Sequence, residues 1–502
     1  MAPVAPPAFD GPLRVSNLKA IATLRSILDR HGFTGAAVGE AIGSPLFGSA
    51  HLRDDLPIYL RRIDAPTPLN TLIKLFVLDR SVDESRARQA VAPLELDDVR
   101  DMGLIEDGPR GIRARLRLSY HDGLVLAHDA YDEERRTLRP DHVLDANPTT
   151  VSLSNLTVRR QVKRALEIGT GGGVLALRAA RHADHVVGTD TNPRALNLAV
   201  FNAAINGVAN VEWRLGSLFE AVDGERFDLI FCNPPYVISP DSQFIFRDGG
   251  RRGDELCEEI VRRAPAYLNE GGFATFLINW AIQAGDDWAV PLNRWVERNS
   301  CDSWFMLSAA QDPMSYAAAW NRTRDREAYS AGVERWTRYF DELGISRIGL
   351  GAVVLRRLAG TAAGRAGGWV RADHLPESVT APASHHIERL FEAGDRLAAL
   401  SSDEALLNEC FRAAADHRMH QRLKIEDGRY AIEAAEVRLI EGLPFNGTVD
   451  AYAIQFLQRC DGRRTVSEIA EAIAADAGVD AAAFTAACPA IVRRLTASGF
   501  LV

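Results

Sequence analysis

The chain has 502 residues, enough for about three domains, and its 47% hydrophobic and 25% charged side chains are ordinary for a globular protein. The net charge is −9, with 19 basic and 22 acidic side chains in residues 1–150 and 14 and 20 in residues 369–502, which disfavours nucleic acid as a partner. No stretch approaches the roughly 18 apolar residues of a membrane span and the N-terminus lacks the regions of a signal peptide, so we expect a cytoplasmic protein without a membrane partner.

The six cysteines are scattered along the chain and form no C-x-x-C pair. In a reducing cytoplasm this arrangement is typical of free, mostly buried thiols. No group of cysteines and histidines has the spacing of zinc ligands, so the sequence predicts no metal site.

The first predicted domain covers residues 12–145, after a flexible tail at residues 1–11. The stretch NLKAIATLRSILDRHG has apolar residues at helical spacing and ends on Gly32, a plausible C-cap. Residues 112–131 alternate like a β-hairpin, with His-Asp-Gly as the turn. Helices followed by a hairpin predict a mainly helical, winged-helix-like unit, to which we assign substrate recognition.

Residues 146–358 alternate strand-like and helix-like segments, which predicts a doubly wound, mostly parallel α/β sheet. The seven strand candidates are KRALEIG, HVVGTD, VEWRLGS, FDLIFCN, FATFLIN, SWFMLSA and IGLGAVVLRR. The connection at about 311–344 is long enough to form a helical insertion.

A linker of small residues, AGTAAGRAGG, is predicted at residues 359–368 and precedes a C-terminal domain at 369–502. This domain begins with an Ala-rich region that we expect to be helical. Its last part predicts helix, turn, helix, helix, with Thr465 and Glu468 as a capping box, and so a winged-helix-like fold. The stretch CDGRRTVSEIA resembles the small peptide-binding domains of the PqqD type.

A glycine-rich loop, Gly169-Thr170-Gly171-Gly172-Gly173, follows the first strand of the α/β domain. Glycines in such a loop let the backbone turn tightly and let a ligand approach closely. The dinucleotide fingerprint would need glycine at Val174, and the P-loop pattern would need Gly-Lys-Ser/Thr, which is absent. The observed pattern is an acidic residue, Glu167, one spacer and then G-x-G-x-G.

The next strand ends at Asp190, where a carboxylate can accept hydrogen bonds from a ribose diol, and Thr191 and Asn192 start the following helix. Asn233-Pro234-Pro235-Tyr236 ends the fourth strand, at the sheet edge where open α/β sheets bind ligands. The Asn233 side-chain oxygen and a proline carbonyl can each accept an N–H, and Tyr236 can stack on a planar group. The prolines fix the backbone, so these groups can hold a planar nitrogen.

These residues resemble the Rossmann-like S-adenosylmethionine methyltransferases, and Asn-Pro-Pro-Tyr resembles the signature of their planar-nitrogen members. The latter include the HemK/PrmC-type release-factor glutamine methyltransferases and the adenine-N6 methyltransferases. The resemblance implies S-adenosylmethionine as the cofactor, S-adenosylhomocysteine as the product and Asn233, Pro234, Pro235 and Tyr236 as catalytic residues. It implies the following cofactor-binding residues: Glu167, Gly169, Thr170, Gly171, Gly173, Asp190, Thr191, Asn192, Ser217, Leu218 and Asn233.

The resemblance to the HemK-type family extends through FRDGGRRGDELCEEIVRRAPAYLNEGGFATFLI, so that it covers about residues 145–280 and the last strand. Ser217 stands where this family has an acidic adenine contact, and the flanking domains differ. We therefore expect N-methylation of an amide or amide-like nitrogen in a protein or peptide. The alternatives are adenine-N6 methylation of RNA or DNA, a small-molecule acceptor, and an inactive binding module.

Overall fold

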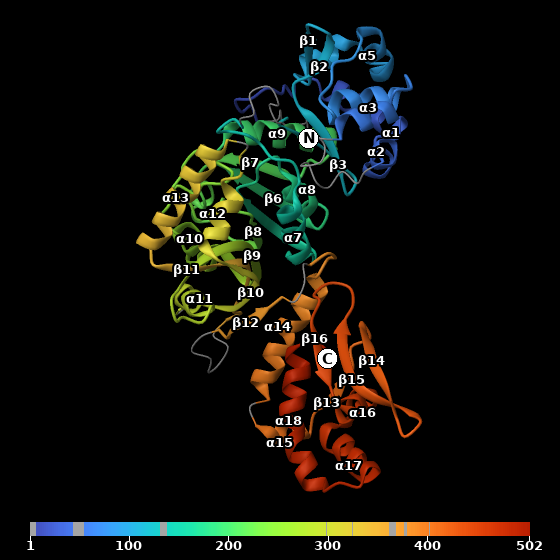
Figure 1. Cartoon of the computed structure of the whole chain (residues 1–502), viewed down its shortest axis with the longest axis vertical. Coiled ribbons are helices and arrows are strands. Elements are labelled where there is room, and N and C mark those ends of the chain that lie inside the picture. Colours follow the sequence, from blue (N-terminus) through green and yellow to red (C-terminus); the bar gives the residue numbers. More distant parts are fainter. Residues whose placement is uncertain are drawn as a thin grey trace. The chain divides into compact units, whose positions relative to one another are not determined.

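The computed structural model describes residues 7–43, 55–130, 138–297, 299–323, 325–360, 368–375, 379–400 and 402–502 (Figure 1). The chain divides into two compact units: residues 1–153, 161–297 and 310–350, and residues 154–160, 298–309 and 351–502. Residues 1–6 of the predicted tail and residues 361–367 of the predicted linker lie outside the described residues. Within the described part of the chain, no helix is both long and apolar enough to span a bilayer.

The first unit begins with a helical region and two β-hairpins. The helices are α1 (Leu18–Arg30), α2 (Gly35–Ile42), α3 (Leu56–Arg62), α4 (Pro68–Leu72), the π-helical η1 (Ile73–Val77), α5 (Glu84–Val91) and α6 (Leu96–Asp101). The hairpins are β1 (Ile105–Gly108) with β2 (Gly111–Ala114), and β3 (Arg117–His121) with β4 (Leu124–His128).

The predicted hairpin is confirmed as β3–β4. Asp122 and Gly123 at its turn both have positive φ, of 49° and 82°, as the favoured two-residue hairpin turn requires. The predicted first helix is confirmed as α1, whose Ile21, Leu24 and Leu28 are completely buried on one face. The hairpin β1–β2 was not predicted.

A large sheet forms the centre of the α/β region. Its strands are β5 (Val162–Ile168), β6 (Ala183–Asp190), β7 (Val211–Leu215), β8 (Phe227–Cys232), β9 (Leu268–Gln283), β10 (Cys301–Gln311), β11 (Ile345–Arg357) and β12 (Val370–His374). Their order is β12-β10-β11-β9-β8-β5-β6-β7, and β5, β6, β7, β8 and β9 pair in parallel. Strands β10 and β11 contribute residues to both units.

All seven predicted strands are present, and the sheet is mostly parallel, as expected. The predicted number of strands is one too low, because β12 pairs in parallel with β10 after the predicted linker. Only five residues long and without a long apolar run, β12 carries little strand signal in the sequence.

The helices of this region connect the strands. They are α7 (Pro148–Leu156), α8 (Val174–Ala179), α9 (Pro193–Ile205), η2 (Glu220–Val222), α10 (Glu255–Tyr267), α11 (Val290–Trp295), α12 (Pro313–Trp320) and α13 (Arg326–Glu342). In Figure 1, α12 and α13 lie beside each other, and they form a helical hairpin between β10 and β11.

The rest of the second unit mixes helices and strands. Its elements are α14 (Ser384–Ala399), α15 (Asp403–Leu407), β13 (Cys410–Arg412), β14 (His417–Glu426), β15 (Arg429–Leu439), β16 (Asn446–Val449), α16 (Ala451–Arg459), β17 (Asp461–Thr465), α17 (Val466–Ala477) and α18 (Ala481–Ala497). The capping box of Thr465 and Glu468 is confirmed at the start of α17.

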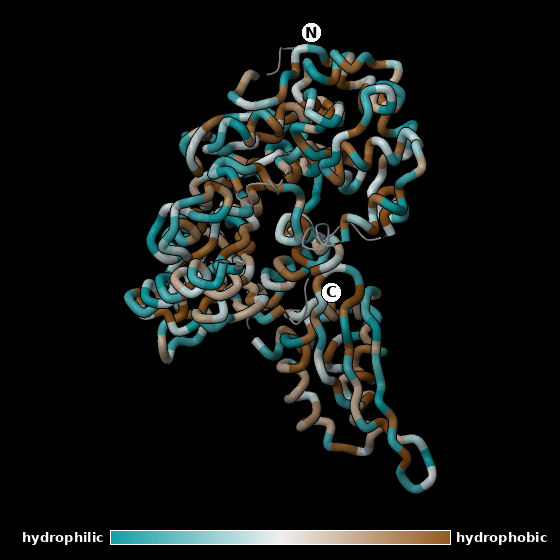
Figure 2. Tube along the Cα trace, turned by 45° about the horizontal axis from the view of Figure 1, so that its top comes forward, coloured by the Kyte–Doolittle hydropathy of each residue, from teal (hydrophilic) through white to brown (hydrophobic). Residues whose placement is uncertain are grey.

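The prediction of a helical region after the linker is wrong for residues 410–449. Strands β14, β15 and β16 form an antiparallel sheet there. Most of β14 is exposed on both faces, so that its sequence lacks the apolar alternation of a half-buried strand. Figure 2 shows the hairpin of β14 and β15 as mostly hydrophilic. Ile425 and Tyr430, which pair with each other near its turn, are both exposed.

Candidate active site

A cavity of about 370 Å³ lies at the carboxyl ends of β5, β6 and β8. These three strands are neighbours in the sheet although β7 separates β6 from β8 in the chain, and ligands of open α/β sheets bind where the strand order reverses in this way. Twelve predicted site residues line it: Glu167, Gly169, Thr170, Gly171, Asp190, Thr191, Asn192, Ser217, Leu218, Asn233, Pro234 and Pro235. The structure therefore brings together most of the residues that the motifs suggested.

The glycine loop shows which glycines face the cavity. Gly169 and Gly171 have φ of 67° and 53°, and a Cβ at either position would meet no atom within 4 Å. Their open surroundings leave room for a ligand beside the backbone. Gly173 is different, because its Cβ would lie 2.7 Å from the Trp213 ring. Gly173 does not line the cavity, and it serves the packing of the α8 N-terminus.

Glu167 is buried under this loop, with 3% of its surface exposed. Its Oε2 accepts hydrogen bonds from the Thr170 hydroxyl at 2.5 Å and the Ala176 N–H at 2.7 Å. Burial raises the pKa of Glu167 to about 8, against the opposing effect of these two hydrogen bonds. A cation in the cavity would favour the ionised carboxylate.

Asp190 joins the glycine loop to the following helix. Its Oδ2 accepts the Gly171 N–H and its Oδ1 accepts the Asn192 N–H, both at 2.8 Å. Burial raises the pKa of Asp190, and the backbone N–H groups oppose that effect. The Thr191 N–H also bonds to this carboxylate, and the lone pairs that remain can accept hydrogen bonds from a diol.

Ser217 and Leu218 lie at the far wall of the cavity, after β7. Leu218 has φ of 49°, a left-handed conformation that is uncommon for a residue with a branched side chain. The Gly216 N–H donates to the Asp190 carbonyl at 3.0 Å, and this hydrogen bond holds the backbone before Ser217 beside the end of β6.

The two polar atoms of the Asn233 side chain differ in whether they have a hydrogen-bond partner. Its Nδ2 donates to the Thr149 hydroxyl at 3.2 Å, whereas its buried Oδ1 has no hydrogen-bond partner among the described residues. Thr149 in turn donates to Asn147 Oδ1 at 2.6 Å. Because the Thr149 hydrogen is used in this way, its oxygen must accept, which orients the Asn233 amide with the oxygen away from Thr149.

Thr149 and Asn147 were missed by the sequence reasoning. Asn147 precedes α7, and Thr149 lies in the first turn of this helix. In the sequence, Thr149 is 84 residues from Asn233. The stretch ANPTT has the Asn-Pro form of a helix start, and this local signal gives no indication of a partner just after β8. The same segment also supplies His142 and Asp145 to the cavity wall.

Tyr236 does not line the cavity. Its ring packs against a buried cluster that includes Val237, Ile238 and Tyr316, and its hydroxyl forms a hydrogen bond with Thr149. Burial raises the pKa of Tyr236. The Tyr236 N–H donates to the Pro234 carbonyl at 2.8 Å, which leaves one lone pair of that carbonyl for another donor.

One cluster in the second unit resembles a metal centre: His385, His386 and Asp416 bring their ligand atoms within 4.8 Å of one another. His386 is fully buried, its Nδ1 accepts the Leu443 N–H at 2.9 Å, and its Nε2 lies 2.7 Å from Asp416 Oδ2. The proton must then be on Nε2. Arg389 donates to both oxygens of Asp416, so the cluster is satisfied by protein groups.

Comparison with known proteins places the cavity in a known family. Residues 142–289 match the family model "Methyltransferase small domain". A putative protein N5-glutamine methyltransferase of Methanocaldococcus jannaschii is 36% identical over 148 residues, which are 28% of this chain and 73% of that protein. The chain belongs to this methyltransferase family.

Other relatives share the same region. A release factor glutamine methyltransferase of Geobacter sulfurreducens is 40% identical over 22% of this chain and 42% of its own length. A ribosomal protein uL3 glutamine methyltransferase of Xanthomonas campestris is 35% identical over 22% of this chain and 41% of its own length. The chain thus spans less than half the length of these two relatives.

The flanking regions match other models. Residues 30–115 match a domain of unknown function, and residues 447–501 match "Coenzyme PQQ synthesis protein D".

The enzyme's cofactor is S-adenosylmethionine, and the cavity suits its sulfonium cation. Asp145, Glu167, Asp190, Asp248 and Arg251 line the cavity. Asp248 is paired with Arg247, whereas Glu167 and Asp190 lie beside the glycine loop, where a bound cation would favour their ionised forms. The open surroundings of Gly169 and Gly171 provide room for the ligand. Glu167, the glycine loop and Asp190 would hold it.

Proposed function

We propose that the enzyme methylates the side-chain amide nitrogen of glutamine in a protein. The observation that carries this proposal is the buried Oδ1 of Asn233, which faces no donor among the described residues although its Nδ2 is bonded to Thr149. A buried oxygen without a partner is costly, and an N–H of the acceptor amide would satisfy it. The relatives named as glutamine methyltransferases support the same acceptor.

The chain's residues would orient the acceptor nitrogen. Asn233 Oδ1 accepts one N–H of the amide, and the remaining lone pair of the Pro234 carbonyl accepts the other. With both N–H bonds held in place, the face of the amide nitrogen is turned toward the cavity. When bound, S-adenosylmethionine supplies an electrophilic methyl group there and leaves as S-adenosylhomocysteine.

The methylated nitrogen is cationic and carries one proton too many. It is far more acidic than the starting amide, so that water can take this proton and no strong general base is required. The roles of Asn233, Pro234 and Pro235 are thus to position hydrogen-bond acceptors. Tyr236 supports Thr149 and Ile238 from outside the cavity, which differs from the stacking role that the sequence suggested.

The test is transfer of tritiated methyl groups to purified unmethylated release factor, to ribosomal protein uL3, and to total cell extract. Label that is lost on protease treatment and kept on nuclease treatment supports a protein acceptor. Label lost on nuclease treatment alone would overturn the proposal in favour of methylation of RNA or DNA. The Asn233→Ala variant is the control for transfer by contaminating enzymes.

A further inference from the structure

The segment after Asn-Pro-Pro-Tyr, residues 238–250, forms one wall of the cavity, and we call it the lid segment. Ile245, Phe246 and Asp248 of this segment line the cavity. Its base is closed by a parallel bridge between Val237 and Asp248. The buried Asp248 carboxylate accepts the N–H groups of Gln243 and Phe244 at 2.9 and 3.0 Å. The lid segment is therefore a folded loop closed on its own carboxylate.

The lid segment packs directly on the residues proposed to hold the acceptor. A Cβ at Gly249 would lie 3.0 Å from the Pro235 carbonyl oxygen, so that the two backbones are in close contact. The Ile245 N–H donates to the Pro140 carbonyl at 3.1 Å, close in the chain to the cavity-lining His142. A shift of the lid segment would therefore disturb Pro235 and the cavity wall that Ile245 and Phe246 form.

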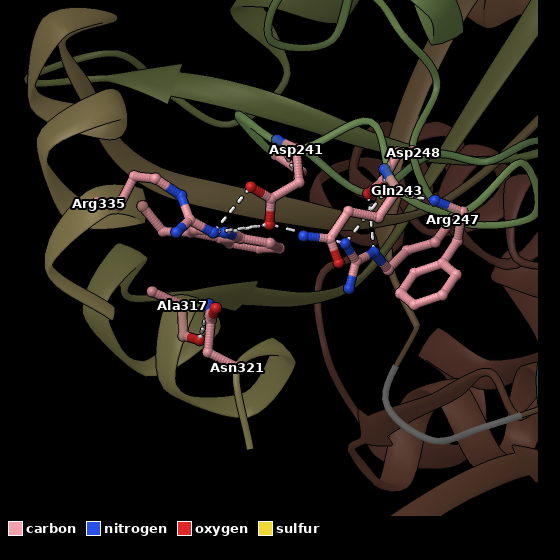
Figure 3. Close-up of polar contacts among 10 residues, drawn as sticks. Asp241, Gln243, Arg247, Asp248, Ala317, Asn321 and Arg335 are labelled. Atoms are coloured by element: carbon pink, nitrogen blue, oxygen red, sulfur yellow. Dashed lines mark hydrogen bonds and ion pairs between the residues drawn. The ribbon is translucent and has the colours of Figure 1, made fainter. Parts of the chain in front are cut away.

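The helical hairpin of α12 and α13 holds the outer side of the lid segment. Trp336 Nε1 donates to Asp241 Oδ2 at 2.9 Å, and Arg335 Nη2 donates to Asp241 Oδ1 at 2.8 Å. Figure 3 shows Arg335 and Asp241 facing each other, with Arg247 bonded to Asp248 on the other side. The Arg247 guanidinium also lies 5.8 Å from the Trp336 ring centroid.

A second contact joins the same hairpin to the start of the lid segment. The Tyr316 hydroxyl accepts the Ile238 N–H at 3.2 Å and the Asn279 Nδ2 at 2.9 Å. Tyr316 and Trp336 are both buried in one cluster with Val237 and Ile238. A third contact is the Gly253 N–H, which donates to the Tyr339 hydroxyl just past the lid segment. The hairpin thus holds the lid segment at its start and middle and the chain just beyond it.

We propose that Asp241, held by Arg335 and Trp336 of α13, is a positioning residue that sets the acceptor side of the active site. The α12–α13 hairpin lies outside residues 142–289, the part of the chain that matches the methyltransferase model. It is therefore a part of this chain that can adapt the shared catalytic edge to this enzyme's own acceptor. This inference rests on the proposed function for the identity of the acceptor, but not for the behaviour of the lid segment.

The experiment compares Arg335→Ala with Arg338→Ala in the full chain. Both arginines lie on α13 with exposed side chains, but Arg335 bonds to Asp241 in the lid segment, whereas Arg338 pairs with Glu334 one turn away. Hydrogen–deuterium exchange of peptides covering residues 238–250 is measured with S-adenosylhomocysteine added. We expect exchange at least about fivefold faster in Arg335→Ala, no change in Arg338→Ala, and recovery in Arg335→Lys.

Kinetics separate positioning from stability. With whichever of release factor or ribosomal protein uL3 is methylated, Arg335→Ala should raise the acceptor KM about fivefold or more while the dissociation constant of S-adenosylhomocysteine stays within about twofold. Equal exchange in the two alanine variants, or an unchanged acceptor KM, would overturn the inference. If neither protein is methylated, the proposed acceptor fails, and the exchange result alone decides whether α13 holds the lid segment.

Discussion

Two polar clusters of this enzyme differ both in residue type and in what is left unsatisfied. In the second unit, His386 and Asp416 are bonded on every side that faces the protein, by Leu443, by Arg389 and by each other. In the first unit, Asn233 is bonded through Nδ2 to Thr149, and its buried Oδ1 has no partner among the described residues. The first arrangement is complete without a ligand, and the second needs one.

This difference in hydrogen bonding, together with the position of Asn233 in the cavity, is the reason for assigning a structural role to His386 and a catalytic role to Asn233. Histidines beside a carboxylate are usual metal ligands, whereas an asparagine next to two prolines resembles a strand end. Counting the hydrogen bonds of each group reverses that ranking, because buried polar groups in folded proteins are nearly always paired.

The largest effect is expected at Asn233. Asn233→Ala removes the acceptor for one amide N–H, and loss of one such positioned group lowers kcat by about 10²–10³-fold. The dissociation constant of S-adenosylmethionine, measured by calorimetry, should change by no more than about threefold, because Glu167 and Asp190 are untouched. An equal loss of cofactor affinity would assign Asn233 to the cofactor site.

At His386 the expected effect is on stability. His386→Ala leaves the Leu443 N–H and part of Asp416 without a partner in a fully buried position, which should cost about 2–4 kcal/mol of unfolding free energy. Denaturant unfolding of the second unit measures this loss. Addition of a chelator should leave the midpoint of the wild type unchanged, and a lower midpoint would show that the cluster does hold a metal.

Thr149 should have a smaller effect. Thr149→Val keeps the shape of the side chain and removes the hydroxyl that orients Asn233, so that kcat should fall about tenfold, the worth of one hydrogen bond. Thr149→Ser keeps the hydroxyl and should stay within about twofold of the wild type. Steady-state rates at saturating cofactor are compared. Equal losses in Val and Ser would place the effect in packing.

At Glu167 the expected effect is on cofactor binding and not on kcat, and it takes the form of a pH dependence. Its pKa of about 8 means that the acid is mostly protonated at neutral pH, and a bound cation favours the carboxylate. Affinity should therefore increase by up to about tenfold per pH unit from pH ~6 to ~8 and then level off. Calorimetry of cofactor binding in buffers of different ionisation heat should show that the wild type releases about one proton near pH 7. The Glu167→Gln variant should release none. Equal proton release in both would contradict the assignment.

The sequence predicted the parts of the fold and site whose signals are local. Long apolar runs such as FDLIFCN identify the central strands, and the glycine loop and Asn-Pro-Pro-Tyr identify the cavity edge. It failed where a residue's role depends on a distant partner. Thr149 acts on Asn233 across 84 residues, and Asp241 bonds to Trp336 across 95.

Two further features that the sequence did not reveal have physical causes of their own. Gly173 belongs to the glycine motif, but a side chain there would collide with the Trp213 ring. Trp213 is 40 residues away in the sequence, so the local motif could not reveal this contact. Strands β14 and β15 are exposed over much of their length, so that they bury too little apolar surface to produce an alternating pattern.

The most direct test of the account is the chemical nature of the methylated atom. Protein labelled by the enzyme with tritiated methyl groups is hydrolysed in hot strong acid, which cleaves amide bonds. A methylated side-chain amide then releases labelled methylamine, and this is the result the account predicts. Label that remains on an amino acid or on a nucleobase would contradict the claim that Asn233 presents an amide nitrogen for methylation.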